Sequence, residues 1–143
     1  GYAIGPEEVM RTMTLISAVQ TYGLNTLGQK AALYALDTQD AKLLERRAVF
    51  ADRMAAVAER LNSMKGIRCH RAEGAFYLFP NISGTGLSSE DFSWRLLESA
   101  KVATIPGNAF GRSGEGYVRI ACTQSRETLM RAMDALEGFV KAL

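Results

Sequence analysis

The sequence predicts an α+β fold in which a small mixed or antiparallel sheet is covered by helices on one face and preceded by a helical connector. Residues 37–143 alternate in the order helix, strand, strand, helix, strand, strand, helix, and this order suits a sheet layered against helices. Residues 6–36 carry helical periodicity without strand-like alternation. With 143 residues and 48% hydrophobic residues, the chain is long enough to bury a core.

The connector contains two predicted helices. Residues 1–5 are apolar and glycine-bounded, and they resemble the end of a strand. Pro6 suits the first turn of a helix that continues to about Tyr22. Gly23 interrupts this helix, and Asn25 or Thr26 can cap a second helix that ends near residue 36. The apolar positions of the first helix lie at helical spacing: Val9, Met13 and Ile16.

The longest predicted helix follows, over residues 37–65. Its apolar side chains step by three, four or seven residues: Leu43, Phe50, Met54, Val57, Leu61 and Met64. Gly66 ends the helix. Residues 67–71 and 75–79 are then predicted strands, which a turn at Glu73 and Gly74 joins into a hairpin.

The second half repeats the change from helix to strand. Residues 88–91, Ser-Ser-Glu-Asp, form a capping sequence for a helix that includes Phe92 and Leu97. A strand is predicted around residues 102–105, and a glycine-rich loop separates it from a strand at 117–122. Ser125 caps the last helix, whose apolar face comprises Leu129, Ala132, Met133, Leu136, Val140 and Leu143.

Arg119 is the one charged residue within the strand at 117–122. Because side chains alternate along a strand, Val118, Ile120 and Cys122 share the core face and Arg119 lies on the other face. A guanidinium group stays charged and presents a planar fork of donors suited to a carboxylate or phosphate. Two alternatives follow, an internal Asp or Glu or the anion of a bound ligand.

Composition excludes several classes of function. The 17 basic and 15 acidic residues are interspersed, so neither nucleic acid nor a membrane surface is expected as the main partner. No apolar run approaches the roughly 20 residues of a membrane span. Cys69 and Cys122 are expected to be buried free thiols in a reducing compartment, which makes a cytoplasmic protein the default. His70 is expected at the surface, because no second metal ligand lies at suitable spacing.

Three segments resemble one enzyme family. Residues 106–111 read PGNAFG and are followed by YVRIA at 117–121 and by Ser125, which resembles the C-terminal signature of class I/II aminotransferases, pyridoxal-phosphate enzymes of fold type I. GAFYLFP at residues 74–80 and GYAIGP at residues 1–6 resemble two further stretches of this family in the same order. The resemblance implies that residues 1–36 are the end of a large-domain strand plus an interdomain connector, and that residues 37–143 are the C-terminal small domain.

The resemblance also implies roles for single residues. The arginine that matches Arg119 binds the substrate α-carboxylate, and Phe76 matches a position near bound substrate. A core aromatic is the alternative for Phe76, and Tyr77 is expected to face the opposite way. Asn108 and Phe110 lie on a loop that resembles the cover of the substrate pocket. Asn25 and Thr26 match, imperfectly, a segment that approaches the cofactor phosphate of the partner subunit.

The implied cofactor is pyridoxal 5'-phosphate, and the implied substrates are an amino acid and a 2-oxo acid. The family's cofactor-binding lysine matches no lysine here, so we expect this chain to need an N-terminal large domain and to be inactive alone. A homodimer is expected for the full-length protein. Two alternatives remain: a lyase or cyclopropane-forming enzyme with the same fold and cofactor, and a free-standing α+β module that binds carboxylates.

Overall fold

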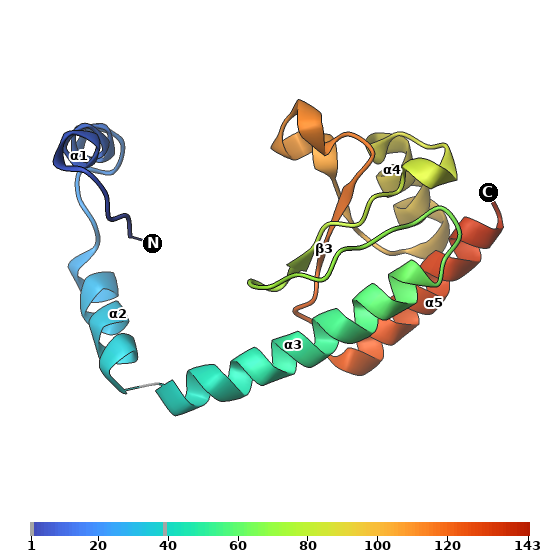
Figure 1. Cartoon of the computed structure of the whole chain (residues 1–143), viewed down its shortest axis with the longest axis horizontal. Helices are drawn as coiled ribbons and strands as arrows, with labels where there is room; N and C mark the ends of the chain where they lie inside the picture. Colours follow the sequence, from blue (N-terminus) through green and yellow to red (C-terminus); the bar gives the residue numbers. More distant parts are fainter. Residues whose placement is uncertain (1, 39) are drawn as a thin grey trace. The chain divides into compact units, whose positions relative to one another are not determined.

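The computed structural model describes residues 2–38 and 40–143. They form two compact units that divide between Leu44 and Glu45, here called the amino-terminal and carboxyl-terminal units. In Figure 1 the amino-terminal unit runs from blue to cyan and the carboxyl-terminal unit continues to red. The domain boundary expected between residues 36 and 37 remains a prediction.

The amino-terminal unit contains helices α1 (Glu7–Thr21) and α2 (Thr26–Thr38) and the first residues of α3 (Asp40–Asn62). Helix α1 ends where Tyr22 adopts the left-handed conformation, with φ of 54°. Of the two predicted caps of α2, Asn25 acts as the cap, because its Oδ1 accepts hydrogen bonds from Leu27 N at 2.8 Å and Gly28 N at 3.3 Å. No residue of α1 or α2 is buried.

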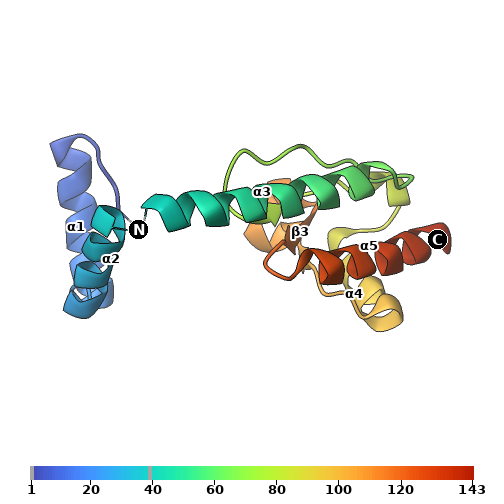
Figure 2. The ribbon, with the colours of Figure 1, turned by 90° about the horizontal axis from the view of Figure 1, so that it is seen from below.

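The carboxyl-terminal unit is built on a three-stranded antiparallel sheet in the order β1-β3-β2. Its strands are short: β1 (Tyr77–Leu78), β2 (Ile105–Pro106) and β3 (Val118–Ala121). Helices α3 and α5 (Arg126–Lys141) lie side by side along one side of this sheet in both views (Figures 1 and 2). Helix α4 (Ser89–Ala100) packs against α5 and β2. The predicted α+β fold, with helices on one face of a small sheet, is confirmed.

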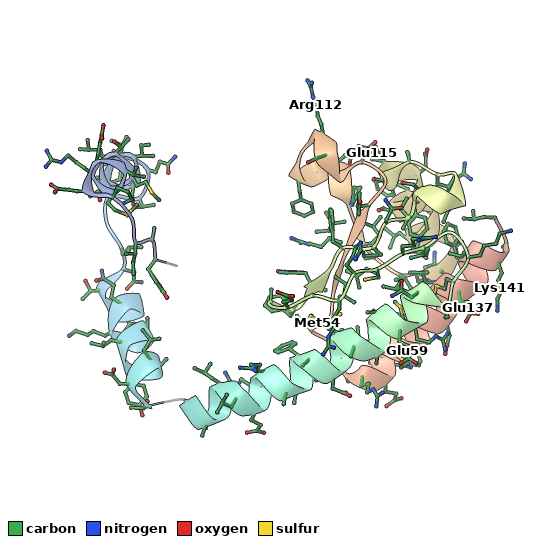
Figure 3. All side chains as sticks on the ribbon, viewed as in Figure 1. Met54, Glu59, Arg112, Glu115, Glu137 and Lys141 are labelled. Carbon is green, nitrogen blue, oxygen red and sulfur yellow. The ribbon has the colours of Figure 1, made fainter. Side chains whose placement is uncertain are left out.

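One core joins these elements. Its large fully buried side chains come from the three helices, from the sheet and from residues beside the strands: Val57, Leu61, Leu78, Ile82, Phe92, Leu96, Val118, Cys122, Met133 and Leu136. Met54, labelled in Figure 3, extends the core along α3. Arg60 of α3 ties the two parallel helices together, because it forms ion pairs with Asp134 at 2.7 Å and Glu137 at 2.9 Å of α5.

The predicted hairpin of residues 67–71 and 75–79 is wrong. The first strand is reduced to Arg68, whose backbone exchanges hydrogen bonds with Asn81 at 2.9 and 2.8 Å. The backbone N–H and C=O of Cys69 bond instead to the side-chain amide of Asn62, both at 2.9 Å, so they are not available to a neighbouring strand. Ala75 has φ of 59°, which interrupts the second strand before β1.

The glycine-rich loop folds into two short 3-10 turns, η2 (Gly107–Phe110) and η3 (Arg112–Gly114). Gly107 is buried where these turns meet, and its N–H donates to the Tyr117 carbonyl at 2.8 Å. A Cβ on Gly107 would overlap the carbonyl oxygens of Gly114 and Tyr117. Glycine is therefore required there for the loop to lie against the start of β3.

No helix within residues 2–38 or 40–143 combines the length and the apolar character needed to cross a membrane.

Candidate functional site

Strand β3 divides its side chains between two environments. Val118, Ile120 and Cys122 are 1%, 7% and 0% exposed and belong to the core. Tyr117 and Arg119 are half-exposed on the opposite face, which the helices leave uncovered. The alternation predicted from the sequence is confirmed, and it places a guanidinium group on the open face of the sheet.

Arg119 lies against two aromatic rings. Its guanidinium carbon is 4.5 Å from the centroid of the Tyr77 ring, which comes from β1, and 4.7 Å from that of Phe110, which comes from η2. These distances are within the range of cation–π attraction. Among the described residues, Arg119 forms no ion pair with a carboxylate, and its guanidinium makes no hydrogen bond to another side chain or carbonyl. The internal carboxylate considered as its anion is therefore not found in the described part of the chain.

Further aromatic rings continue this surface. Phe79 stacks on Tyr117 with centroids 5.2 Å apart and planes at 6°, and its edge meets Phe110 at 6.2 Å. Ile105 pairs with Arg119 across β2 and β3, so it shares that face of the sheet. We call this surface the Arg119 face; it comprises Tyr77, Phe79, Ile105, Phe110, Tyr117 and Arg119. It is an apolar surface with a single cationic group.

The N-terminus of α4 fixes the loop that carries Phe110. The buried Ser89 hydroxyl accepts hydrogen bonds from Gly116 N at 2.9 Å and Tyr117 N at 3.2 Å and donates to Gly114 O at 3.4 Å. Ser89 N in turn donates to Glu115 Oε1 at 2.9 Å. A hydroxyl that satisfies three backbone groups of one loop holds that loop in a single conformation, and sequence analysis did not single out this role of Ser89.

The structure brings together some of the predicted site residues. Arg119 and Phe110 are in contact, whereas Asn108, in the same turn, donates from its side chain to Glu90 Oε1 at 3.3 Å. Phe76 lies 5.7 Å from Phe50 of α3 and 4.4 Å from Tyr77, measured between ring centroids. Phe76 is half-buried beside α3 and is not among the core residues, and its role near substrate remains a prediction.

Tyr77 was missed as a candidate. It lies opposite Ala121 in the register of β1 and β3, which puts it on the same face as Arg119. Alternation within residues 75–79 predicts that Tyr77 and Phe76 point to opposite faces of the sheet. Only the pairing of β1 with β3 shows that Tyr77, and not Phe76, lies on the same face as Arg119. The sequence carries no signal for that register.

A second cation near the site points elsewhere. Arg112, on η3, is exposed and projects away from the body of the unit (Figure 3).

Asn25 and Thr26, the predicted cofactor-phosphate contacts, belong to the amino-terminal unit. The side-chain oxygen Oδ1 of Asn25 already caps α2 there. Their contact with a cofactor phosphate stays a prediction.

The residues present do not fit a covalent cofactor site. The five lysines, Lys30, Lys42, Lys65, Lys101 and Lys141, are all exposed. In the described part of the chain, no cluster of His, Cys, Asp and Glu could hold a metal ion. We therefore assign no reaction step through a cofactor to this chain.

The two cysteines are free and buried, as predicted. Burial, followed by the neighbouring Cys69 thiol, raises the pKa of Cys122 to about 11, although Arg53 acts in the opposite direction. Burial also raises the pKa of Cys69. Thiols that stay protonated are weak nucleophiles, so these residues belong to the core. His70 is exposed, also as predicted.

Comparison with known proteins decides the family. The sequence model described as aminotransferase class I and II matches residues 1–136. The chain belongs to this family. It is 43% identical over 139 residues to an aspartate aminotransferase of Pyrococcus horikoshii, covering 96% of this chain and 36% of the relative. It is 39% identical to aromatic-amino-acid aminotransferase 2 of Thermococcus litoralis, covering 99% of this chain and 36% of that protein.

Solved structures agree with the sequence comparison. An aromatic aminotransferase of Pyrococcus horikoshii superposes with a TM-score of 0.81 at 38% identity, over 96% of this chain and 37% of that one. An aspartate aminotransferase of Rhizobium meliloti gives 0.79 at 31% identity, over 96% and 36% of the two chains. This class I and II aminotransferase chain thus spans slightly more than a third of the length of the relatives it matches.

Proposed function

We propose that the chain is the C-terminal part of a pyridoxal-phosphate-dependent aminotransferase and that Arg119 binds the α-carboxylate of the amino acid and 2-oxo acid substrates. The observation that carries this proposal is the guanidinium of Arg119, which is held on the open face of the sheet without a carboxylate partner among the described residues. A charged group that the fold leaves without an internal partner is available to a ligand.

The residues of this chain would bind and orient substrate. The planar fork of Arg119 can donate two charge-assisted hydrogen bonds to a carboxylate, which fixes the position of the α-carbon. Phe110 lies against the guanidinium, and Phe79 and Ile105 extend the same apolar face. In the full-length protein this surface would exclude water and strengthen those bonds. Pyridoxal phosphate would supply the electron sink, and we expect the lysine that binds it covalently to lie outside this chain.

The amino-terminal unit would contact other parts of the full-length protein. Its described helices expose many large apolar side chains, and a pocket of about 620 Å³ in this unit is lined by residues that include Met10, Met13 and Tyr22. Apolar surface of this extent favours a buried interface. We propose that the large domain and the second subunit of a homodimer cover it, and that Asn25 and Thr26 then approach the partner's cofactor phosphate.

The test uses the full-length protein with pairs of amino acids and 2-oxo acids. Transfer of the amino group, with kcat/KM reduced by about a hundredfold or more in Arg119→Ala, supports the proposal, because two charge-assisted bonds are worth about 1.5 to 3 kcal/mol each. Release of ammonia or sulfide without amino transfer would instead identify a lyase of the same fold. Binding of carboxylates without any turnover would identify a binding module.

A further inference from the structure

We propose that Tyr77 and Phe110 are positioning residues that hold the Arg119 guanidinium so that it selects planar carboxylates over tetrahedral oxyanions of equal charge. This inference rests on the proposed role of Arg119 as the carboxylate-binding group. It adds two residues and a basis for specificity to that role.

Two aromatic rings determine the orientation of the Arg119 guanidinium. Tyr77 comes from β1 and Phe110 from η2, so the two rings approach Arg119 from separate elements, at 4.5 and 4.7 Å. A guanidinium over an aromatic ring gains electrostatic attraction through its face, while its N–H donors lie in its plane. Contact with the rings therefore leaves the in-plane edge as the part available to an anion.

The Phe110 ring is held in place by its neighbours. Phe110 is 54% exposed, yet its edge contact with Phe79 and the stacking of Phe79 on Tyr117 support it through the residues that follow β1 and precede β3. The loop itself is fixed to α4 through the Ser89 hydroxyl and through the bond between Asn108 and Glu90. An exposed ring with this support stays in place before a ligand arrives. The rotamer freedom of the long Arg119 side chain is then lost on folding and not on binding, which favours affinity.

The shape of an anion determines how it meets the guanidinium and the two rings. A carboxylate is planar and presents two oxygens to the donor fork within one plane. A sulfonate of the same charge carries a third oxygen outside that plane, which would approach the negative face of a flanking ring. The rings therefore penalise the tetrahedral anion and leave the carboxylate unaffected. Without a ring, the guanidinium can turn, and the difference between the two anions should shrink.

The experiment measures competitive inhibition of the full-length enzyme by butanoate and by propane-1-sulfonate, which share their alkyl chain and charge. The parent should bind butanoate more tightly. In Phe110→Leu and in Tyr77→Leu, the ratio of the two inhibition constants should move toward one by about 3- to 30-fold, the range expected for loss of one cation–π contact. The conservative variants Phe110→Tyr and Tyr77→Phe keep the ring and should restore the parental ratio.

Trp94→Leu is the matched control, because Trp94 is an exposed aromatic of α4 outside the Arg119 face. It should leave both inhibition constants at their parental values. If Tyr77→Leu and Phe110→Leu weaken inhibition by both anions equally, so that the ratio of the inhibition constants stays parental, selection by the rings is refuted. If the ring variants give this result and Arg119→Ala is no longer inhibited by either anion, the proposed function still holds. Unchanged inhibition in Arg119→Ala would overturn the proposed function itself.

Discussion

The two units of the chain differ in how they use their apolar residues. In the carboxyl-terminal unit, α3, α4 and α5 enclose a core with the sheet, and Phe92, Leu96 and Leu136 have no exposed surface. In the amino-terminal unit, helices α1 and α2 have a similar supply of apolar residues, but none is buried, and Leu15, Leu33 and Leu36 are more than 60% exposed.

The difference shows that apolar residues at helical spacing do not by themselves produce a buried core. Both units have capped helices with spaced apolar residues, yet only the carboxyl-terminal unit has a sheet on which helices close. Most of the stability of a helix in a protein comes from packing its apolar face. The carboxyl-terminal unit should therefore be stable by itself, whereas the amino-terminal unit should depend on other parts of the protein.

Separation of the units is the most severe test of this comparison. Residues 45–143 produced alone should unfold cooperatively, because the core described above lies entirely within them. Residues 1–44 produced alone should show little helix, because α1 and α2 bury no residue and their 15 and 13 residues are close to the length, about 12 to 15, below which isolated helices are marginal in water. Circular dichroism during heating measures both. A cooperative transition in residues 1–44, or its absence in residues 45–143, would break the comparison.

Two leucine substitutions in the 143-residue chain compare the stability contribution of a buried residue in the carboxyl-terminal unit with that of an exposed residue in the amino-terminal unit. Leu96→Ala removes a fully buried side chain and should lower the free energy of unfolding by about 2 to 5 kcal/mol. Leu33→Ala removes a side chain that is 61% exposed and should change it by less than about 0.5 kcal/mol. Urea unfolding followed by circular dichroism gives both values. Equal losses would show that Leu33 is packed.

Alkaline pH tests the core of the carboxyl-terminal unit. The pKa of Cys122 is raised from 9.0 to about 11, so the folded state holds this proton more tightly than the unfolded state does. Its contribution is complete below pH 9 and is lost as the pH rises toward 11, amounting to about 3 kcal/mol. Urea titrations across this range should show a steeper loss for the parent than for Cys122→Ala. Parallel curves would contradict the burial of this thiol.

The smallest expected effect on stability comes from an ion pair at the surface of the carboxyl-terminal unit. Glu137 and Lys141 lie near each other on α5 (Figure 3). Hydrogen bonding from Lys141, at 2.6 Å, lowers the pKa of Glu137, and the charge of Arg60 lowers it further. The contribution of Glu137 is therefore present above its ordinary pKa and is lost as the pH falls through its lowered value. Glu137→Gln should reduce the unfolding temperature slightly at neutral pH, and concentrated salt should remove the difference. A difference that persists in salt would indicate a role other than charge pairing.

The sequence predicted the helices and the inner face of β3 well, because these depend on local periodicity. Ser88 and Ser125 cap α4 and α5 as expected, each accepting a hydrogen bond from a backbone N–H three residues later. The predicted strand at 67–71 does not form, because the side chain of Asn62, a residue of α3, makes hydrogen bonds with the backbone of Cys69. That is a contact between elements, and periodicity within one segment cannot report it.

The candidate site divides in the same way. Arg119 was found from alternation within its own strand, and Phe110 from the resemblance of its loop to a known family. Tyr77 was not found, because its place beside Arg119 depends on the register between β1 and β3. Residues that act through pairing of distant segments need the structure.

The most direct test of the account is the unfolding temperature of full-length Arg119→Ala, measured with and without butanoate. Without ligand, the variant should unfold at a temperature close to that of the parent, because Arg119 forms no ion pair with a carboxylate among the described residues. Butanoate should stabilise the parent and should not stabilise the variant. If Arg119 were part of a buried ion pair, its loss would cost about 3 kcal/mol and several degrees. A destabilised variant that butanoate still stabilises as much as it does the parent would contradict the account.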